Sequence, residues 1–386
     1  MRTVIVKKQE PADVADTPNS VHFQPVGRGR NSLPVAVLSA IDPVLREALL
    51  ASLLLDAEGV VALRYEVDEK AAALRRLVIA ADGVIEDELV HLDHPCASCA
   101  MREDAVPTLG RLAGIGGIAA VVLAPPLSAE PSIVAGALRP HQGSWHLAAA
   151  VTAVDLGEVR DDLLGDDTLA ERGLQWAAGD ARSVGEALAA QTEYADTLVV
   201  EGEAAGPGAE LVEHLRAPEQ RLVHGVFALP AAELLEGTLD HLLGLRRRDV
   251  RYVEPHGGPV EHGTWTLDLC SERPFHPDRL LENIEELGAG SLRGRGRFWV
   301  PDRPDSICQW DGAGGQVSIG AVWRAGRELP TTRLVVTGID RADRARVREA
   351  FGRSLLTARE WEAGLEPWLG AEDLLAPWLG VRGAAA

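Results

Sequence analysis

Short apolar runs alternate with amphipathic stretches through the first half of the chain. Pro34–Leu38 is apolar enough for a buried strand, and Asp42 and Pro43 after it are residue types that begin a helix, with apolar positions continuing to Leu55. Further runs of strand length occur at Val60–Tyr65, Leu77–Ile79, Ile118–Leu123, Leu147–Val154 and Thr197–Val200. An Ala- and Glu-rich helix is predicted before the last run. Strands alternating with helices predict an α/β fold with a mostly parallel sheet, whose ligand edge lies at the carboxyl ends of its strands.

A second pattern begins after the arginine run Leu245–Asp249, which is followed by Gly257 and Gly258 and which we interpret as a solvated linker. Beyond it, strand-like runs occur at Thr264–Cys270, Leu292–Val300, Ser306–Trp310, Gln316–Ile319 and Arg333–Thr337. Helices are predicted over Pro277–Leu287 and Ala342–Ser354. This order of elements predicts a smaller antiparallel α+β unit, covered by helices on one face.

The patterns divide the 386 residues into two globular units with flanking segments, as a chain of this length suggests. Residues 1–31 lack periodicity for the most part and are predicted to be a mobile tail. Residues 32–228 form the α/β unit, 229–262 a helix and linker, and 263–386 the α+β unit. The tryptophans of the second unit are expected in its core, with a binding platform as the alternative; they are Trp265, Trp299, Trp310 and Trp323.

Composition excludes several classes of protein. Hydrophobic residues make up 46% of the chain, too many for wholesale disorder, and a formal net charge of −20 argues against bulk nucleic-acid binding. A local arginine patch could still dock an acidic partner, including a ribosome-linked one. No apolar run approaches the ~18 residues of a membrane span, and no export signal is evident. Four cysteines do not resemble a disulfide framework, which indicates a reducing, cytoplasmic location.

Metal-ligand residues crowd into positions 91–104. The pattern His-x-x-His-x-Cys-x-x-Cys is formed by His91, His94, Cys96 and Cys99. Four nitrogen and sulfur ligands suit tetrahedral zinc, so the sequence predicts a Zn²⁺ site on the two thiols, with His94 as the preferred third ligand. The candidates for the fourth position are His91, Glu103 and Asp104.

The thiol pair also allows other interpretations. Apolar positions at helical spacing begin at Ala100, which predicts that Cys99 lies at or just before a helix N-terminus, where the helix dipole lowers the pKa of a thiol. A redox Cys-x-x-Cys on an α/β scaffold is one alternative. Two buried, inert thiols beside solvent-facing histidines are the other.

Two segments resemble the CobW family of P-loop GTPases, metallochaperone-like proteins linked to zinc and cobalt. Cys96–Asp104 resembles the Cys-rich signature of the family, and Arg273–Leu280 resembles the opening of its C-terminal domain. The resemblance extends from about Pro34 to the C-terminus. It implies a P-loop-NTPase-like sheet with helices on both faces, followed by the CobW-type C-terminal domain. The family usually has Cys-x-Cys-Cys, whereas Ser98 here replaces the middle thiol.

The nucleotide motifs that the resemblance implies are degenerate. A phosphate-binding loop needs G-x-x-x-x-G-K-[ST], but the corresponding turn, Ser39–Leu45, has neither glycine nor lysine. Asp42 places a carboxylate where phosphate would bind, and Pro43 removes an N–H donor. The segment expected near the γ-phosphate reads Ala124–Pro131, and Glu201–Ala204 stands where the family reads guanine; neither keeps the motif.

These observations lead to a hypothesis and a rival. The hypothesis is a CobW-like zinc-binding protein in metal homeostasis or zinc-linked regulation, acting through a protein partner as a pseudo-GTPase. Its Zn²⁺ is expected to be bound, and GTP with Mg²⁺ is not, since phosphoryl transfer depends on positioned cations and backbone donors. The rival is a GTP-dependent zinc or cobalt metallochaperone with a non-standard nucleotide site. Family resemblance implies GTP hydrolase activity, so the enzyme question stays open. A third interpretation assigns the function to the C-terminal unit alone.

Overall fold

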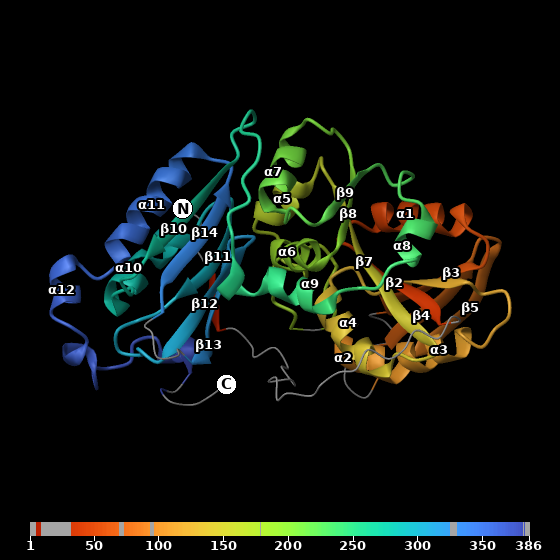
Figure 1. Cartoon of the computed structure of the whole chain (residues 1–386), viewed down its shortest axis with the longest axis horizontal. Helices are drawn as coiled ribbons and strands as arrows, with labels where there is room; N and C mark the ends of the chain where they lie inside the picture. The colour runs from red at the N-terminus through yellow and green to blue at the C-terminus, as the bar shows by residue number, and fades with distance from the viewer. Residues whose placement is uncertain are drawn as a thin grey trace.

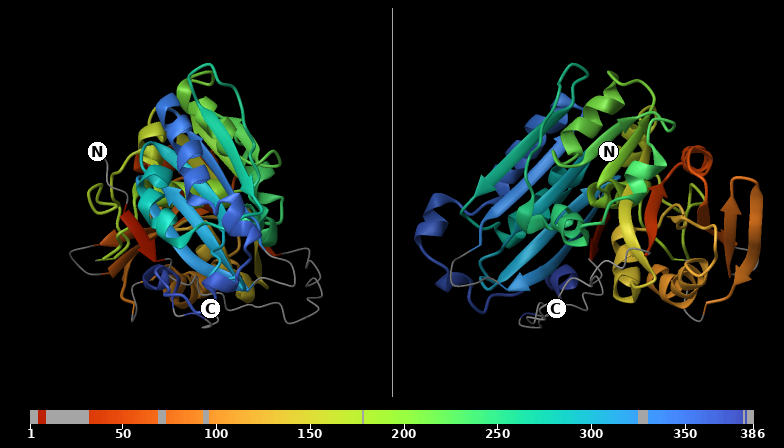
Figure 2. Two further views of the ribbon diagram at one scale, coloured as in Figure 1. Left: turned by 90° about the vertical axis from the view of Figure 1, so that its left-hand side faces the viewer. Right: turned by 45° about the vertical axis from the view of Figure 1, so that its right-hand side comes forward.

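Two sheets, one in each half of the molecule, organise the computed structural model, which describes residues 5–8, 32–68, 73–92, 96–177, 179–324, 330–380 and 382. Figure 1 shows the eight-stranded sheet with its helices on the right and the six-stranded sheet with its helices on the left. Figure 2 shows the same two layered units from two further directions. No helix within the described ranges combines the length and apolarity that crossing a membrane requires.

The first sheet has the strand order β5-β4-β3-β6-β2-β7-β8-β9. The strands are β2 (Leu33–Ala40), β3 (Val60–Asp68), β4 (Ala73–Ala80), β5 (Gly83–Val90), β6 (Ala120–Ala124), β7 (Trp145–Asp155), β8 (Thr197–Glu201) and β9 (Arg221–His224). The strands from β3 to β9 in this order pair in parallel, while β4 and β5 add an antiparallel hairpin at one edge. The expectation of a mostly parallel α/β sheet is confirmed.

Helices cover both faces of this sheet, as the sequence predicted. On one face α1 (Pro43–Asp56) buries its leucines against β2, β3 and β6. On the other face the packing elements are α2 (Ala97–Ala100), a π-helical turn (Met101–Ala105), α3 (Val106–Leu112), α4 (Pro131–Leu138) and α6 (Val184–Tyr194). Two further helices, α5 (Val159–Leu164) and α7 (Pro207–Leu215), pack beyond β8.

The sequence patterns missed β5 and β9. Most of β5 is exposed on both faces and carries Glu86, Asp87 and Glu88, so it lacks the apolar alternation that reveals a half-buried strand. Strand β9 has only four residues, of which one is buried. Both lie at the edges of the sheet, where burial, the property that sequence patterns report, is least.

The second sheet has the order β1-β13-β12-β11-β14-β10. Its strands are β1 (Ile5–Lys8), β10 (Trp265–Ser271), β11 (Leu292–Phe298), β12 (Ser306–Ala313), β13 (Gln316–Arg324) and β14 (Thr332–Gly338). All pairings are antiparallel except that of β1 with β13. Helices α10 (Pro277–Gly288) and α11 (Arg341–Ser354) pack on the sheet and against each other, and α12 (Ala358–Glu362) and α13 (Ala376–Leu379) follow.

Two expectations for this unit have clear outcomes. Trp265, Trp299 and Trp310 are buried, which confirms the core interpretation for these three; the side chain of Trp323 lies outside the described residues. The expectation of a mobile tail is wrong for Ile5–Lys8, because these residues extend the sheet by pairing with β13. Residues 9–31 lie outside the described part of the chain.

The arginine run is a helix, not a solvated linker. After α8 (Ala231–Leu235), α9 (His241–Arg248) packs on α6 so closely that a Cβ on Gly244 would lie 2.7 Å from the ring of Tyr194. Arg247 donates to the carbonyl oxygen of Tyr194 at 2.6 Å, and Arg248 pairs with Glu130 at 2.9 Å. The run was misread because its partners lie more than 50 residues away, where a local pattern cannot report them.

Candidate metal centre

Cys96 and Cys99 lie at the N-terminus of α2, which packs on one face of the first sheet. Cys96 is the N-cap of α2, with extended backbone angles, and its sulfur accepts a hydrogen bond from the amide of Cys99 at 3.3 Å. Both side chains are half-buried, and all four cysteines of the chain are free thiols. The thiol of Cys96 caps the helix, and Cys99 is the third residue of its first turn. The sequence had placed Cys99 at the helix N-terminus or just before it.

The surroundings of Cys99 disfavour its ionisation. The neighbouring Cys96 raises the pKa of Cys99 above the ordinary value, and burial adds to this; the guanidinium of Arg102, 3.7 Å from the Cys99 sulfur, opposes them. The expectation of a lowered pKa at this thiol is therefore wrong for the metal-free arrangement. A soft cation beside Cys99 would offset this effect, because it favours the thiolate form of its ligands.

Of the two histidines in the motif, the structure describes only His91. His91 follows the end of β5 and is exposed. His94, the preferred third ligand, lies outside the described residues with its neighbours Asp93 and Pro95. Within the ranges that the structure describes, no three His, Cys, Asp or Glu side chains converge as a metal site would require. The two thiols alone would supply two of the four donors that a tetrahedral zinc site needs.

The two carboxylates after the thiols have different surroundings. Glu103 is exposed on the π-helical turn. Asp104 points into the protein: one of its oxygens accepts from the hydroxyl of Tyr65 at 2.5 Å, and the other from Arg76 at 2.6 Å. Burial, followed by the nearby Asp104, raises the pKa of Tyr65 well above the ordinary value. Asp104 is therefore occupied with anchoring the helix to β3 and β4, and is poorly placed to serve as a metal ligand.

Sequence reasoning could not have found Tyr65 and Arg76 as the partners of Asp104. They lie 39 and 28 residues before it, on strands whose order in the sheet no local pattern reveals. The five-residue π turn over Met101–Ala105 follows α2 directly and carries Asp104, while Met101 and Ala105 are buried. Turns of this type often occur at functional positions in helices.

The turn in the position of a phosphate loop is occupied by its own side chain. Asp42 is the N-cap of α1, and one of its oxygens accepts from the amides of Val44 at 2.6 Å and Leu45 at 2.8 Å. Pro43 follows as the first helical residue and offers no amide. These are the donors that would bind a phosphate at a helix N-terminus.

Further negative charge lies beside this turn. Burial raises the pKa of Asp162 above its ordinary value, and Glu158 and Asp42 raise it further, although Arg172 opposes them with an ion pair at 3.0 Å. Asp42 therefore contributes to a locally negative environment. A triphosphate would meet repulsion at the place where a P-loop supplies a lysine.

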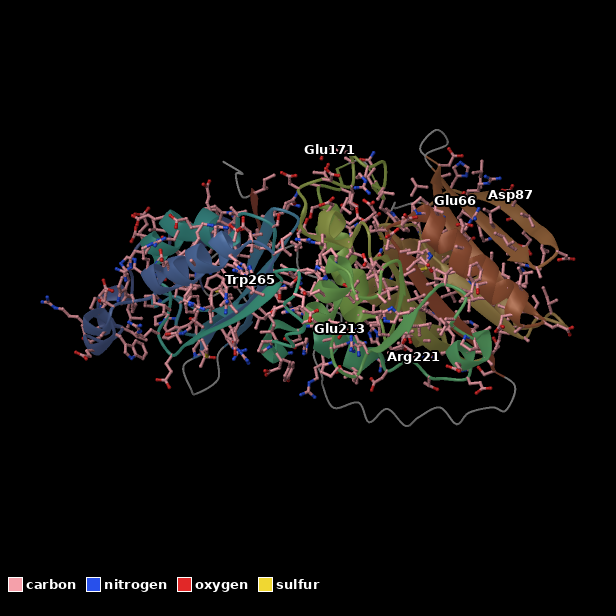
Figure 3. The ribbon with its side chains drawn as sticks, turned by 90° about the horizontal axis from the view of Figure 1, so that it is seen from above. Glu66, Asp87, Glu171, Glu213, Arg221 and Trp265 are labelled. Atoms are coloured by element: carbon pink, nitrogen blue, oxygen red, sulfur yellow. The ribbon has the colours of Figure 1, made fainter. Side chains whose placement is uncertain are left out.

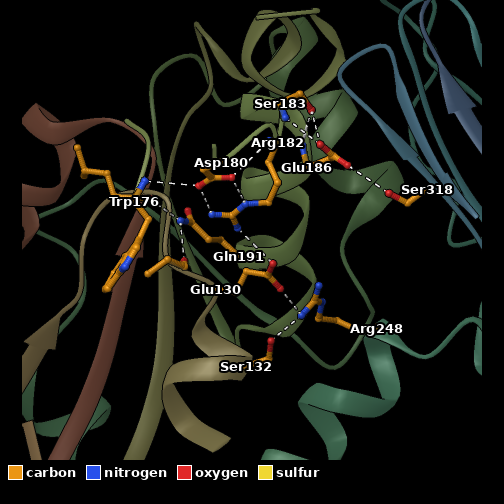
Figure 4. Close-up of polar contacts among 12 residues, drawn as sticks. Glu130, Ser132, Trp176, Asp180, Arg182, Ser183, Glu186, Gln191, Arg248 and Ser318 are labelled. Atoms are coloured by element: carbon orange, nitrogen blue, oxygen red, sulfur yellow. Dashed lines mark hydrogen bonds and ion pairs between the residues drawn. The ribbon is translucent and has the colours of Figure 1, made fainter. Parts of the chain in front are cut away.

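The segment expected near a γ-phosphate is fixed by contacts with other parts of the chain (Figure 4). Glu130, just before α4, pairs with Arg182 at 3.2 Å and with Arg248 at 2.9 Å. The side-chain amide of Gln191 donates to the carbonyl oxygens of Leu127 and Ala129 at 2.6 and 3.2 Å. Contacts with Arg182, Arg248 and Gln191 thus fix the conformation of this loop.

The segment in the guanine-reading position is also committed to the fold. Glu201 accepts the amide of Val226 at 2.9 Å. His262, from the segment that leads into the second unit, makes a hydrogen bond through its ring nitrogen with the carbonyl oxygen of Ala205 at 2.8 Å. Each of the three nucleotide-motif segments is thus engaged in at least one contact within the fold.

The fold combines a mostly parallel α/β sheet, covered by helices on both faces, with a second, mainly antiparallel sheet. Comparison with known proteins identifies its second unit: residues 264–355 match the family described as cobalamin synthesis protein cobW C-terminal domain. The chain therefore carries the C-terminal domain that is typical of CobW proteins.

Characterised relatives of the chain are named for zinc. Over 281 residues the chain is 27% identical to a zinc chaperone of Mycobacterium tuberculosis, which covers 67% of this chain and 66% of that relative's length. It is 25% identical over 324 residues to zinc-regulated GTPase metalloprotein activator 1 of Dictyostelium discoideum, covering 76% and 68%. The chain thus spans about two thirds of each relative.

A solved structure, Zn(II)-bound YjiA GTPase from E. coli, aligns over 84% of this chain and 99% of that chain, with 15% identity and a TM-score of 0.35. This similarity is too low to carry an argument about the site.

Proposed function

We propose that this protein acts in zinc homeostasis by carrying Zn²⁺ as cargo on Cys96 and Cys99 and delivering it to a protein partner, without hydrolysing GTP. The observation that carries the proposal is the pairing of two free, half-buried thiols at one helix N-terminus, joined by the 3.3 Å contact between the Cys99 amide and the Cys96 sulfur. Free thiols also suit a reducing, cytoplasmic location. The zinc-related names of two relatives agree with it.

The remaining ligands are proposed from position and availability. His94 precedes Cys96 by two residues in the chain. We propose it as the third ligand on the basis of this spacing alone. For the fourth position, the exposed side chains of His91 and Glu103 are available, whereas Asp104 would have to release Tyr65 and Arg76. Two thiolates and one imidazole with an open or weakly held fourth position suit a cation that must be released to a client, because a closed four-ligand site retains its metal.

The geometry of the phosphate turn supports the pseudo-GTPase part of the proposal. To bind a phosphate there, α1 would have to exchange the two amide bonds to Asp42 for bonds to the ligand and bring two negative charges together. The Ser39–Leu45 turn itself contains no lysine that would compensate.

A GTP-dependent zinc metallochaperone is the second candidate, favoured by the relative named a zinc-regulated GTPase metalloprotein activator. It requires a nucleotide site that does not use the Ser39–Leu45 turn, or a conformation in which Asp42 leaves its amides. Nucleotide binding separates the two candidates, and zinc binding does not.

Zinc analysis of the dialysed full-length protein tests the cargo site. We expect about one Zn²⁺ per chain for the wild type and for Cys270→Ser, which removes an exposed thiol elsewhere, and almost none for Cys96→Ser/Cys99→Ser. His94→Ala should weaken binding with the thiols intact. If the double Cys variant retains as much zinc as the wild type, the cargo site lies elsewhere.

A further inference from the structure

A hollow of about 620 Å³ opens at the edge of the second sheet, far along the chain from the thiols. It lies between the outermost strand β10, helix α11 and the glycine-rich segment that leads into the second unit. Its walls include Arg341, Arg344, Arg348, Trp265, Gly258 and Val260. Figure 3 shows Trp265 on this sheet and Glu213 on α7, the helix whose His214 also borders the hollow. Its volume is that of a typical ligand site.

Three arginines in this hollow have no counter-ion among the residues that the structure describes. Arg341, Arg344 and Arg348 recur at i, i+3 and i+7 on α11, so they lie on one face of the helix, and all three are exposed. No guanidinium group of the three makes a hydrogen bond or ion pair with another described residue. By contrast, Arg346 and Arg353 on the same helix pair with Asp343 and Glu286.

The charge of this hollow is the opposite of that of the protein. The chain as a whole carries a formal charge of −20, yet no carboxylate is among the described residues that line the hollow. The nearest acids on α11 are already engaged: Asp340 caps the helix by accepting the amide of Ala342 at 2.8 Å, and Asp343 accepts from Arg346 at 2.7 Å. An anionic ligand would be repelled by most of the surface and attracted here.

We propose that this hollow is the docking site for an acidic, extended segment of a partner protein. Arg341 to Arg348 span about 10 Å along the helix, whereas side chains on one side of an extended peptide recur roughly every 6.6 Å, so two or three carboxylates can pair along the row. A single phosphate group would reach only part of it. Guanidinium groups bind carboxylates through two parallel N–H bonds, which adds geometric specificity to the electrostatic attraction. This site is separate from the thiols and from the nucleotide-motif turns.

Fluorescence anisotropy of a fluorescein-labelled hexaglutamate peptide with the full-length protein, at low salt, tests the proposal. We expect saturable binding that weakens as salt is added. Arg341→Gln/Arg344→Gln/Arg348→Gln should raise the Kd roughly tenfold or more, since three charge-assisted contacts are lost. Arg359→Gln, which removes an exposed arginine on α12, should leave the Kd unchanged.

A second pair of variants keeps the arginines in place. Ala345 borders the hollow between the arginines, so Ala345→Glu should weaken binding while Ala345→Gln, of the same size, should not. An unchanged Kd in the triple variant or in Ala345→Glu would overturn the proposal. It would also be overturned if hexaglutamate showed no saturable binding, including the case in which inorganic tripolyphosphate binds instead, because the hollow would then be a small-anion pocket.

Discussion

The carboxylate of Glu193, at the end of α6, and the guanidinium of Arg293, on β11, form an ion pair at 2.6 Å although they are 100 residues apart in the chain. Their side chains are only 10% and 3% exposed. Arg293 also pairs with Asp311 on β12 at 2.5 Å. Burial disfavours the charge, but Asp311 and Glu193 together raise the pKa of Arg293 above its ordinary value. The buried arginine therefore links α6, which packs on the first sheet, to the second sheet.

Arg293→Gln should therefore destabilise the protein strongly, because it removes the closest cation from the buried carboxylate of Glu193, which keeps only Arg295 at 3.3 Å, and from Asp311. We expect a loss of about 3 kcal/mol in the free energy of unfolding, measured by urea denaturation. The matched control is Arg353→Gln, whose partner Glu286 is 49% exposed and whose loss should cost at most about 1 kcal/mol. Equal losses in the two variants would contradict a special role for the buried pair.

Asp42→Ala should lower the free energy of unfolding by about 1–2 kcal/mol, since α1 loses its N-cap and a favourable charge at its positive end. Asp42→Asn keeps an oxygen that can accept the same two amides and should cost much less. Thermal melts of the two variants beside the wild type measure the difference. If alanine were tolerated as well as asparagine, the cap would not be what holds this turn.

The same cap predicts the nucleotide behaviour. Isothermal titration calorimetry with GTP or ATP, in the presence of Mg²⁺ and Zn²⁺, should show no saturable binding at sub-millimolar nucleotide, because Asp42 already occupies the amides of Val44 and Leu45. A P-loop GTPase in the same buffer serves as the positive control. A micromolar Kd that is abolished by substitutions within Ser39–Leu45 would establish the GTP-dependent metallochaperone instead.

The thiol pair should be inactive as a redox catalyst. Cys96 and burial raise the pKa of Cys99, whereas a redox nucleophile needs it lowered, and the opposing effect of Arg102 does not outweigh them. In an insulin-reduction assay, the wild type should match Cys96→Ser/Cys99→Ser. Turnover close to that of a thioredoxin would restore the redox interpretation.

Acid should weaken the fold through His241, which is hydrogen-bonded to the hydroxyl of Tyr194 at 2.7 Å. Burial, helped by Arg139, lowers the pKa of His241 to about 4, while in the unfolded chain it is near 6.5. Between these values the unfolded state binds a proton that the folded state does not, so stability present above pH 6.5 is lost as the pH falls toward 4, by roughly 2 kcal/mol.

Urea denaturation at several pH values measures this contribution. His241→Gln should flatten the dependence of unfolding free energy on pH in that window, whereas His141→Gln, at an exposed histidine, should leave the slope as in the wild type. Parallel slopes in all three proteins would show that other groups carry the acid sensitivity.

Local sequence patterns determined the elements with buried faces and the chemistry of neighbouring residues. The runs Pro34–Leu38 and Leu147–Val154 became β2 and β7 because a buried strand must be apolar along its length. Asp42 and Pro43 marked the start of α1, since capping is a contact between residues two and three apart. The proximity of Cys96 and Cys99 followed from their spacing in the same way.

Tertiary structure decided which of the charged residues are free. The sequence left Arg248 on a solvated linker and Asp104 among the metal ligands, whereas the fold pairs Arg248 with Glu130 and Asp104 with Arg76. It also added Ile5–Lys8 to the second sheet and left the row beginning at Arg341 without counter-ions. The physical reason is common to all: periodicity reports how deeply a position is buried, but the partner of a charge or a strand edge comes from a distant segment that only chain folding brings near.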